Sequence, residues 1–154
     1  VKGLVLINTL RKPSSRLDWI NRAMVNAAKL GGSALIMDMG MPVIASPKFL
    51  NKVKSNALVF ENYKPLDKND GIFKLMEGSL STNWSFDWSK INVPTLIMTG
   101  HLDKMFRIPE DIEDLLKKIK NPIRLELPSC GHLIPLEEPE QFSDHIIKFA
   151  KNLN

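Results

Sequence analysis

The sequence is poor in cysteine and in long apolar runs. Cys130 is the only cysteine among 154 residues, so an internal disulfide cannot form, which fits a reducing compartment. No stretch approaches the roughly 18 consecutive apolar residues that indicate a membrane-spanning helix. The N-terminus also lacks the layout of a signal peptide. We therefore expect a cytoplasmic protein with no membrane span.

An extended basic run is also missing. The net charge is +4, and the lysines are spread along the chain apart from Lys117, Lys118 and Lys120. These three lie near the end of a predicted helix, where cations interact favourably with the helix dipole. We therefore expect a solvated helix end and no nucleic-acid partner. The length, with 44% hydrophobic and 25% charged residues, is typical of one globular domain.

A third absence concerns nucleophiles. The motif G-x-S-x-G, which places a serine on a sharp turn between a strand and a helix, occurs nowhere in the chain. Two other serines follow glycine. Ser33 comes after a predicted helix end, and Ser79 lies within or just after a predicted helix. Because neither has the strand–turn–helix context of an activated serine, we expect neither to act as the nucleophile.

Three segments predict β-strands. Residues 4–7 and 95–98 are continuous apolar runs, which are typical of parallel strands covered on both faces. Residues 123–127 alternate apolar and polar side chains, which indicates a half-exposed strand at a sheet edge.

Two well-marked helices accompany the last two predicted strands. They open at Pro109 and Pro139, in the first helical turn, where the missing proline N–H costs no hydrogen bond. Their expected buried faces comprise Ile112, Leu115, Leu116 and Ile119 in the first helix, and Phe142, Ile146, Phe149, Ala150 and Leu153 in the second. The order strand, helix, strand, helix predicts an α/β fold with a parallel sheet of about three strands and right-handed crossovers.

Residues 11–90 separate the first two predicted strands by far more than a crossover connection needs. We expect three helices there: one near 18–30 that stops at Gly31-Gly32, one that starts at Ser46-Pro47, and one that follows Asp70-Gly71. A helical insertion between parallel strands predicts a lid over the carboxyl edge of the sheet, where such sheets bind ligands. The expected division is a core of residues 1–10 and 91–154 with a helical lid of residues 11–90.

Two residues near strand ends are candidates for acid–base chemistry. His132 follows Gly131 in a short loop after the third predicted strand, and an imidazole there is suited to act as a general base. Asp103 lies three residues after Gly100, in the loop leaving the second strand, where it could accept the histidine N–H. Taken singly, His132 is also compatible with a surface histidine, and Asp103 with a turn residue that bonds its own backbone.

Neighbouring residues offer weaker alternatives. His101 and Asp103 form a His-x-Asp pair, but no third ligand follows at a recognisable spacing, so we expect a loop histidine and no metal site. Cys130 lies two residues before His132, and neighbours in one loop seldom present a nucleophile to its base. A structural role for Cys130 is the favoured interpretation.

The predicted lid is rich in methionine. Met37, Met39 and Met41 are candidates for an apolar substrate surface, since methionine adapts to irregular shapes, and Leu133 beside the candidate base is a further one. The alternative for the methionines is a small core within the lid. Trp84, Phe86 and Trp88 are expected to anchor the lid to the main body.

The two flanks of the chain together resemble the C-terminal part of the α/β-hydrolase superfamily. Residues 1–8 are similar to the sixth strand of that family, and residues 93–154 to its last two strands with their loops and helices; the lid segment matches only in kind. The most specific element is the histidine-loop pattern Cys130-Gly-His-Leu-Ile-Pro-Leu-Glu137 followed by Pro139. The order of Asp103 before His132 is also that of the family's catalytic triad.

The resemblance implies an esterase-like or carbon–carbon-bond serine hydrolase that uses no metal or organic cofactor. Asp103 and His132 would be the triad acid and base, and the substrate a small apolar ester or ring compound. The nucleophile and oxyanion hole would lie upstream of Val1, so this C-terminal part would be inactive alone. A non-catalytic binding module with the same fold and one half of a split hydrolase remain alternatives. If the chain exists in isolation, its first strand is expected to pair with a second copy of the chain or with a separate N-terminal half.

Overall fold

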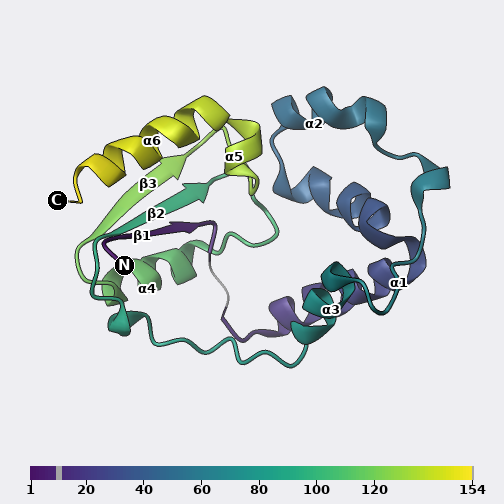
Figure 1. Ribbon diagram of the computed structural model, residues 1–154, viewed down its shortest axis with the longest axis horizontal. Helices are drawn as coiled ribbons and strands as arrows, with labels where there is room; N and C mark the ends of the chain where they lie inside the picture. The colour runs from purple at the N-terminus through teal and green to yellow at the C-terminus, as the bar shows by residue number, and fades with distance from the viewer. Residues whose placement is uncertain (10–11, 154) are drawn as a thin grey trace. The chain divides into compact units, whose positions relative to one another are not determined.

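The computed structural model describes residues 1–9 and 12–153 (Figure 1). The chain divides into two compact units. The sheet unit comprises Val1–Leu10, Val43–Phe49 and Asp87–Asn154, and the helical unit comprises Arg11–Pro42 and Leu50–Phe86. The segment Val43–Phe49, from the middle of the expected insertion, thus belongs to the sheet unit. Among the described residues, no helix is long and apolar enough to cross a bilayer.

The sheet unit is built on three parallel strands, as predicted, and their order in the sheet is β1-β2-β3. The strands are β1 (Leu4–Ile7), β2 (Thr95–Gly100) and β3 (Pro122–Leu127). All six residues of the central strand β2 are buried, which explains its continuous apolar run. The sequence also placed β3 correctly at an edge. Its alternation does not produce one buried face, because Ile123 is 47% exposed near the start of the strand.

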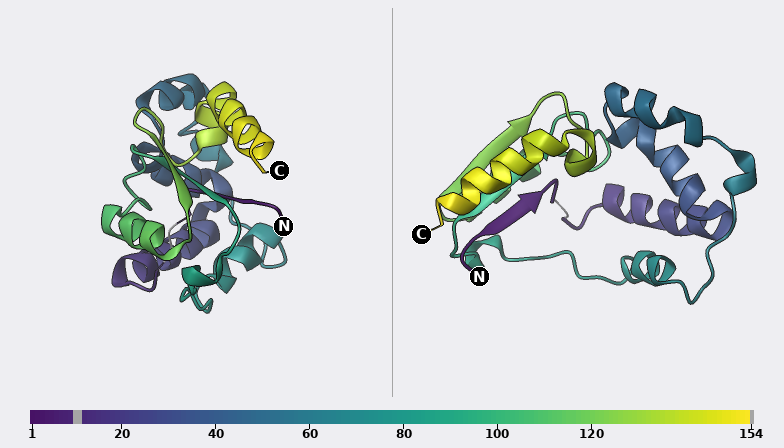
Figure 2. Two further views of the ribbon diagram at one scale, coloured as in Figure 1. Left: turned by 90° about the vertical axis from the view of Figure 1, so that its left-hand side faces the viewer. Right: turned by 45° about the horizontal axis from the view of Figure 1, so that its top comes forward.

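Helices cover both faces of this sheet. Helix α4 (Pro109–Lys118) packs on one face, and helices α5 (Ile134–Glu137) and α6 (Pro139–Lys151) pack on the other. Figure 2, left, shows α4 and α6 on opposite sides of the strands. Successive side chains of a strand point to opposite faces, so neighbours on β2 enter different cores. The α4 core contains Leu6, Ile97, Ile112, Leu115 and Ile119, and the α5–α6 core contains Leu96, Met98, Leu127, Cys130, Ile134 and Phe149.

The predicted helix boundaries in the sheet unit hold well. Proline occupies the first turn of both α4 and α6. The expected stripe of α6 packs on the sheet core except for Ala150, which is exposed and was wrongly placed. Ala150 follows Phe149 by one residue, or about 100° around the helix, and so turns toward solvent. The short helix α5, immediately after the histidine loop, was not predicted.

The helical unit begins with the long element α1 (Ser15–Ile44), whose last residues enter the sheet unit. Gly32 interrupts it with φ 66° and ψ −156°. The predicted break at Gly31-Gly32 is therefore present, but a second helical stretch continues to Ile44. This stretch was missed because the glycine pair is a strong helix-end signal and residues 37–42 contain both glycine and proline.

The remaining helices of the insertion begin where the sequence indicated. Helix α2 (Pro47–Val53) starts after Ser46, whose Oγ accepts the Phe49 N–H at 3.3 Å. Helix α3 (Gly71–Gly78) starts after Asp70, whose Oδ1 accepts the Ile72 N–H at 2.7 Å. Both are N-cap contacts that satisfy otherwise unpaired helix donors. Short 3-10 turns lie at η1 (Lys54–Asn56), η2 (Phe60–Asn62) and η3 (Trp88–Lys90).

Gly32→Ala should destabilise the helical unit strongly. The positive φ is unfavourable for alanine, and an added Cβ would lie 2.1 Å from the Lys64 carbonyl oxygen. We expect a loss of about 3 kcal/mol in the free energy of unfolding, measured by urea denaturation of the full chain. Gly71→Ala is the matched control, because nothing lies within 4 Å of a Cβ built there. Equal stability of the two variants would contradict the prediction.

Candidate active site

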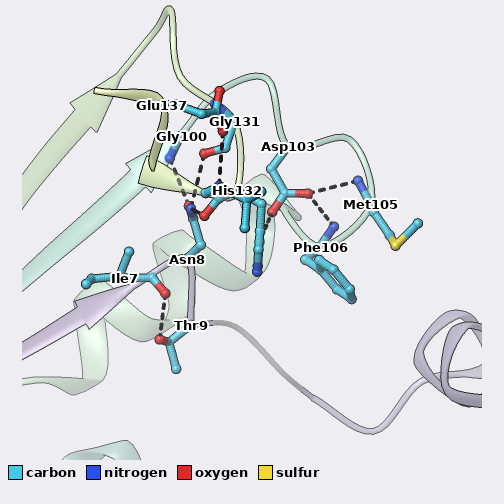
Figure 3. A network of polar contacts seen from close by, with 11 residues as sticks. Ile7, Asn8, Thr9, Gly100, Asp103, Met105, Phe106, Gly131, His132 and Glu137 are labelled. Atoms are coloured by element: carbon cyan, nitrogen blue, oxygen red, sulfur yellow. Dashed lines mark hydrogen bonds and ion pairs between the residues drawn. The ribbon is translucent and has the colours of Figure 1, made fainter. Parts of the chain in front are cut away.

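The loops after all three strands converge at one edge of the sheet (Figure 3). Asn8 follows β1, Asp103 lies in the loop after β2, and His132 lies in the loop after β3. Parallel strands in register end at the same edge, which is where such sheets carry ligand sites. The strand order therefore brings together residues separated by as many as 124 positions.

Asp103 and His132 form a direct pair in this edge. The imidazole Nδ1 lies 2.6 Å from the Asp103 Oδ2. The side chain of Asp103 is 1% exposed, whereas that of His132 is 30% exposed. The carboxylate is thus enclosed, and the imidazole is accessible from outside. This is the juxtaposition predicted from the two loops.

The second oxygen of Asp103 is held by its own loop. Oδ1 accepts the N–H groups of Met105 at 3.0 Å and Phe106 at 2.9 Å. The turn interpretation of this aspartate and its pairing with histidine are therefore both correct, one for each oxygen. The Phe106 ring also packs on the imidazole of His132, with ring centroids 4.9 Å apart. The loop after β2 consequently fixes both the carboxylate and the ring that faces it.

This arrangement defines the chemistry available to His132. An ionised carboxylate only accepts hydrogen bonds, so the proton of the neutral imidazole resides on Nδ1. Nε2 then carries the lone pair and can take a proton from a hydroxyl group. A buried carboxylate beside Nδ1 also stabilises the imidazolium that such a transfer creates.

Asn8 is a site residue that sequence reasoning missed. Its Oδ1 accepts the Gly100 N–H at 2.9 Å, and its Nδ2 donates to the carbonyl oxygens of Gly131 at 3.2 Å and His132 at 2.7 Å. One side chain therefore joins the ends of β1 and β2 to the histidine loop. The residue has φ 46°, which asparagine tolerates better than most residues. An asparagine directly after a continuous apolar strand was the available signal.

Glu137, at the end of α5, was also missed. This buried carboxylate accepts N–H groups from Gly131 at 2.9 Å, Leu133 at 3.0 Å and Ser46 at 2.8 Å. It lies beside Gly131 in Figure 3. The sequence gives no indication of these contacts because every donor is a backbone group.

His101 has a different environment. Its Nε2 lies 3.0 Å from Glu126 Oε2, at ion-pair distance but outside hydrogen-bond geometry. Glu126 also accepts hydrogen bonds from Arg124, and this contact is the main cause that lowers the pKa of Glu126. Within the described ranges, no three His, Cys, Asp or Glu side chains are grouped to hold a metal ion.

Cys130 is buried in the α5–α6 core, and burial raises the pKa of its thiol from 9.0 to about 12. Only the thiolate is nucleophilic. Three pKa units correspond to about a thousandfold smaller thiolate fraction at pH 8. We therefore expect a thiol-reactive disulfide reagent to modify the folded protein at least about a thousandfold more slowly than the urea-unfolded chain. Comparable rates for the two states would contradict the structural role.

The remaining candidate residues are dispersed. Ser33 is exposed in the second half of α1, and the Ser79 hydroxyl donates to the Met76 carbonyl at the end of α3. Neither serine lies between a strand and a helix, in agreement with the sequence. The candidate substrate contacts have unequal environments: Met37 and Met39 are 45% and 63% exposed, Met41 is buried, and Leu133 is half-buried. Their contact with substrate stays a prediction.

Comparison with solved structures identifies the fold. A thermophilic esterase from Thermogutta terrifontis superposes on 99% of this chain with a TM-score of 0.76 and 20% identity, over 56% of the esterase. MGS-M2, an alpha/beta hydrolase enzyme from a Medee basin deep-sea metagenome library, superposes on 96% of the chain with a TM-score of 0.78 and 24% identity, over 55% of its own length.

A curated protein is also similar in sequence. The uncharacterized hydrolase YugF of Bacillus subtilis (strain 168) is 32% identical over 114 residues, which cover 66% of this chain and 40% of YugF. No protein-family model matches the chain. The sheet and helices of the chain therefore have the fold of the α/β-hydrolases among these solved structures. It spans 40% of the curated relative and little more than half of the solved structures above.

Proposed function

We propose that this chain supplies the acid and base of a serine hydrolase. The observation that carries the proposal is the 2.6 Å contact between His132 Nδ1 and the buried Asp103 carboxylate, at the edge of the sheet where three strands end. His132 Nε2 takes the proton of the nucleophilic serine and later delivers it to the leaving group. Asp103 holds the productive tautomer and stabilises the imidazolium.

The nucleophile of this proposal lies outside the 154 residues, which contain no G-x-S-x-G. The reaction class is ester hydrolysis or hydrolysis of a carbon–carbon bond in a small apolar or ring-type substrate. The chain covers only 56% and 55% of two longer hydrolase structures, which supports a nucleophile outside these residues. Residues 11–90 act as the helical cap, in which Met37, Met39 and Met41 contact the apolar part of the substrate together with Leu133. Without a nucleophile and oxyanion donors, the chain by itself gives little catalysis.

The edge strand β1 supplies the pairing surface in this proposal. Within the described sheet β1 pairs with β2, and a strand edge presents backbone groups that another strand can bind. We infer that this edge pairs with further hydrolase sequence or with a second copy of the chain. Sedimentation velocity over a hundredfold concentration range tests the isolated chain. A single monomeric species at the highest concentration would contradict pairing with a second copy of the chain.

Labelling of the native protein, purified from its source, with a serine-directed fluorophosphonate tests the function. The proposal predicts covalent labelling at a serine outside residues 1–154, located by peptide mass spectrometry. The intact mass of the labelled polypeptide then separates two forms of the enzyme. A mass well above 17.4 kDa indicates one long chain, and labelling only in a complex of two polypeptides indicates a split hydrolase.

Absence of labelling would overturn the proposal. If the active-site reagent labels a reference hydrolase under the same conditions and leaves the native protein unmodified, the chain belongs to a non-catalytic module with the same fold. Labelling that persists at the same rate after His132→Gln would also contradict the assigned base, because the serine would then be activated without His132.

A further inference from the structure

The histidine loop has an unusual distribution of backbone hydrogen bonds. Three consecutive N–H groups, those of Gly131, His132 and Leu133, all donate to acceptors outside the loop backbone. The two flanking groups donate to Glu137, Gly131 to Oε2 at 2.9 Å and Leu133 to Oε1 at 3.0 Å. The central His132 N–H donates to the Ile44 carbonyl oxygen at 2.6 Å. The backbone on both sides of His132 is therefore held by one carboxylate.

The same carboxylate reaches a second segment, the strap, defined here as residues 43–46. Glu137 Oε2 accepts the Ser46 N–H at 2.8 Å. The strap also accepts the Lys104 N–H at its Val43 carbonyl oxygen, at 2.8 Å. Since Lys104 directly follows Asp103, the strap is bonded to the loop of the acid as well as to the loop of the base.

The position of Glu137 is costly for a carboxylate without specific donors. Glu137 is buried at the end of the four-residue helix α5, and burial of a carboxylate carries a desolvation cost. The three backbone N–H groups compensate for this cost, and bonds to an ionised acceptor are stronger than neutral ones. The Glu137 carboxylate is thus stabilised by hydrogen bonds from the histidine loop and the strap.

We propose that Glu137 is a positioning residue that fixes His132 against Asp103 by anchoring the peptide groups before and after it and tying them to the strap. The proposal rests on the function assigned to the Asp103–His132 pair. Glu137 touches neither imidazole nor substrate in this role. It sets the position of the His132 backbone, and the 2.6 Å contact between the imidazole and Asp103 depends on that position.

The decisive variant is Glu137→Gln in the native protein. The glutamine amide preserves size and one acceptor oxygen, but its NH₂ group cannot accept an N–H, so at least one of the three backbone bonds is lost. Misplacement of a catalytic group on the ångström scale costs up to about a hundredfold in rate. We expect kcat and the rate of fluorophosphonate labelling to fall by about 10- to 100-fold, with KM changed less than about twofold.

Glu138→Gln is the matched control. Glu138 is the adjacent acid, and its carboxylate pairs with the largely exposed Lys48 at 2.7 Å, whereas the N–H groups of the histidine loop donate to Glu137 and Ile44. This variant should retain wild-type kcat and labelling rate. If Glu138→Gln lowered kcat and the labelling rate as much as Glu137→Gln, the effect would not be specific to Glu137, and the proposal would be overturned.

A spectroscopic measurement separates positioning from general stability. The Nδ1 proton of a histidine bonded to a carboxylate resonates far downfield in the proton NMR spectrum. We expect this signal of His132 to shift or broaden in Glu137→Gln and to remain unchanged in Glu138→Gln. An unchanged signal and unchanged labelling in a folded Glu137→Gln variant would overturn the positioning role.

The wild-type protein provides a test that needs no variant. If Glu137 holds the loop, the amides of Gly131, Leu133 and Ser46 exchange with solvent slowly and at similar rates, despite lying in loops or at a helix start. Rapid exchange at Gly131 and Leu133 would overturn the proposal even if Glu137→Gln failed to fold. Failure of the proposed function is distinguishable, because then His132→Gln would also leave labelling unchanged.

Discussion

Asp103→Asn is expected to lower kcat of the native protein for the proposed hydrolysis about 10⁴-fold while leaving the fold intact. The two oxygens of Asp103 have separate partners: Oδ1 accepts the Met105 and Phe106 N–H groups, and Oδ2 pairs with His132. An asparagine can keep its oxygen at the Oδ1 position and satisfy both backbone donors. Its NH₂ group must then face the imidazole.

The tautomer explains the size of this effect. An NH₂ group donates to Nδ1, so the imidazole carries its proton on Nε2. His132 in that form has no lone pair on Nε2 and cannot accept the proton of a serine. The opposite orientation of the amide would place NH₂ against two N–H donors and leave both unpaired in a partly buried loop, which is costly. Activity is therefore lost although every backbone bond survives.

Steady-state kinetics on an ester substrate, with the phosphonate labelling rate in parallel, check this prediction. Asp67→Asn is the control, because Asp67 Oδ1 accepts the Asn69 N–H at 2.7 Å in an exposed turn where asparagine serves equally well. The control should keep wild-type kcat and thermal stability. A loss of less than about tenfold in Asp103→Asn would remove Asp103 from the assigned role.

The sequence predicted the contact between Asp103 and His132 from local signals. Asp103 and His132 each follow a strand that is marked by its own residues, and parallel strands that pair in register deliver their loops to one edge. The order of the strands was the only long-range information required. The same local signals, proline at a first helical turn and a capping aspartate or serine, gave the starts of α2, α3, α4 and α6.

What the sequence could not provide are contacts between a side chain and distant backbone. Asn8 bonds to His132 across 124 positions, and Glu137 to Ser46 across 91. A peptide group has no residue identity, so no motif or spacing records that it is an acceptor or donor. The prediction missed the second half of α1 for a related reason. The backbone at Gly32 passes close to the distant Lys64 carbonyl group, and the helix resumes after this interruption.

The close approach of two loops underlies the second large effect, that of Gly100→Ala. Gly100 ends β2, and a Cβ built on it would lie 1.9 Å from the Gly131 carbonyl oxygen and 2.8 Å from that of Cys130. Both obstacles are backbone atoms, so no side-chain rotation can relieve the overlap. The histidine loop or the end of β2 must move. Both are fixed in place by Asn8, which binds Gly100 N and Gly131 O.

We expect Gly100→Ala to lower the free energy of unfolding by about 3 kcal/mol and to reduce kcat together with stability. A methyl group at Gly100 displaces Gly131, and His132 follows directly on that residue, so the imidazole leaves its position beside Asp103. Urea denaturation and phosphonate labelling measure the two consequences. Gly40→Ala is the control, since nothing lies within 4 Å of its Cβ and alanine inside a helix is favoured over glycine by about 0.5–1 kcal/mol. Retention of wild-type labelling in Gly100→Ala would mean that the histidine loop does not need this contact to place His132.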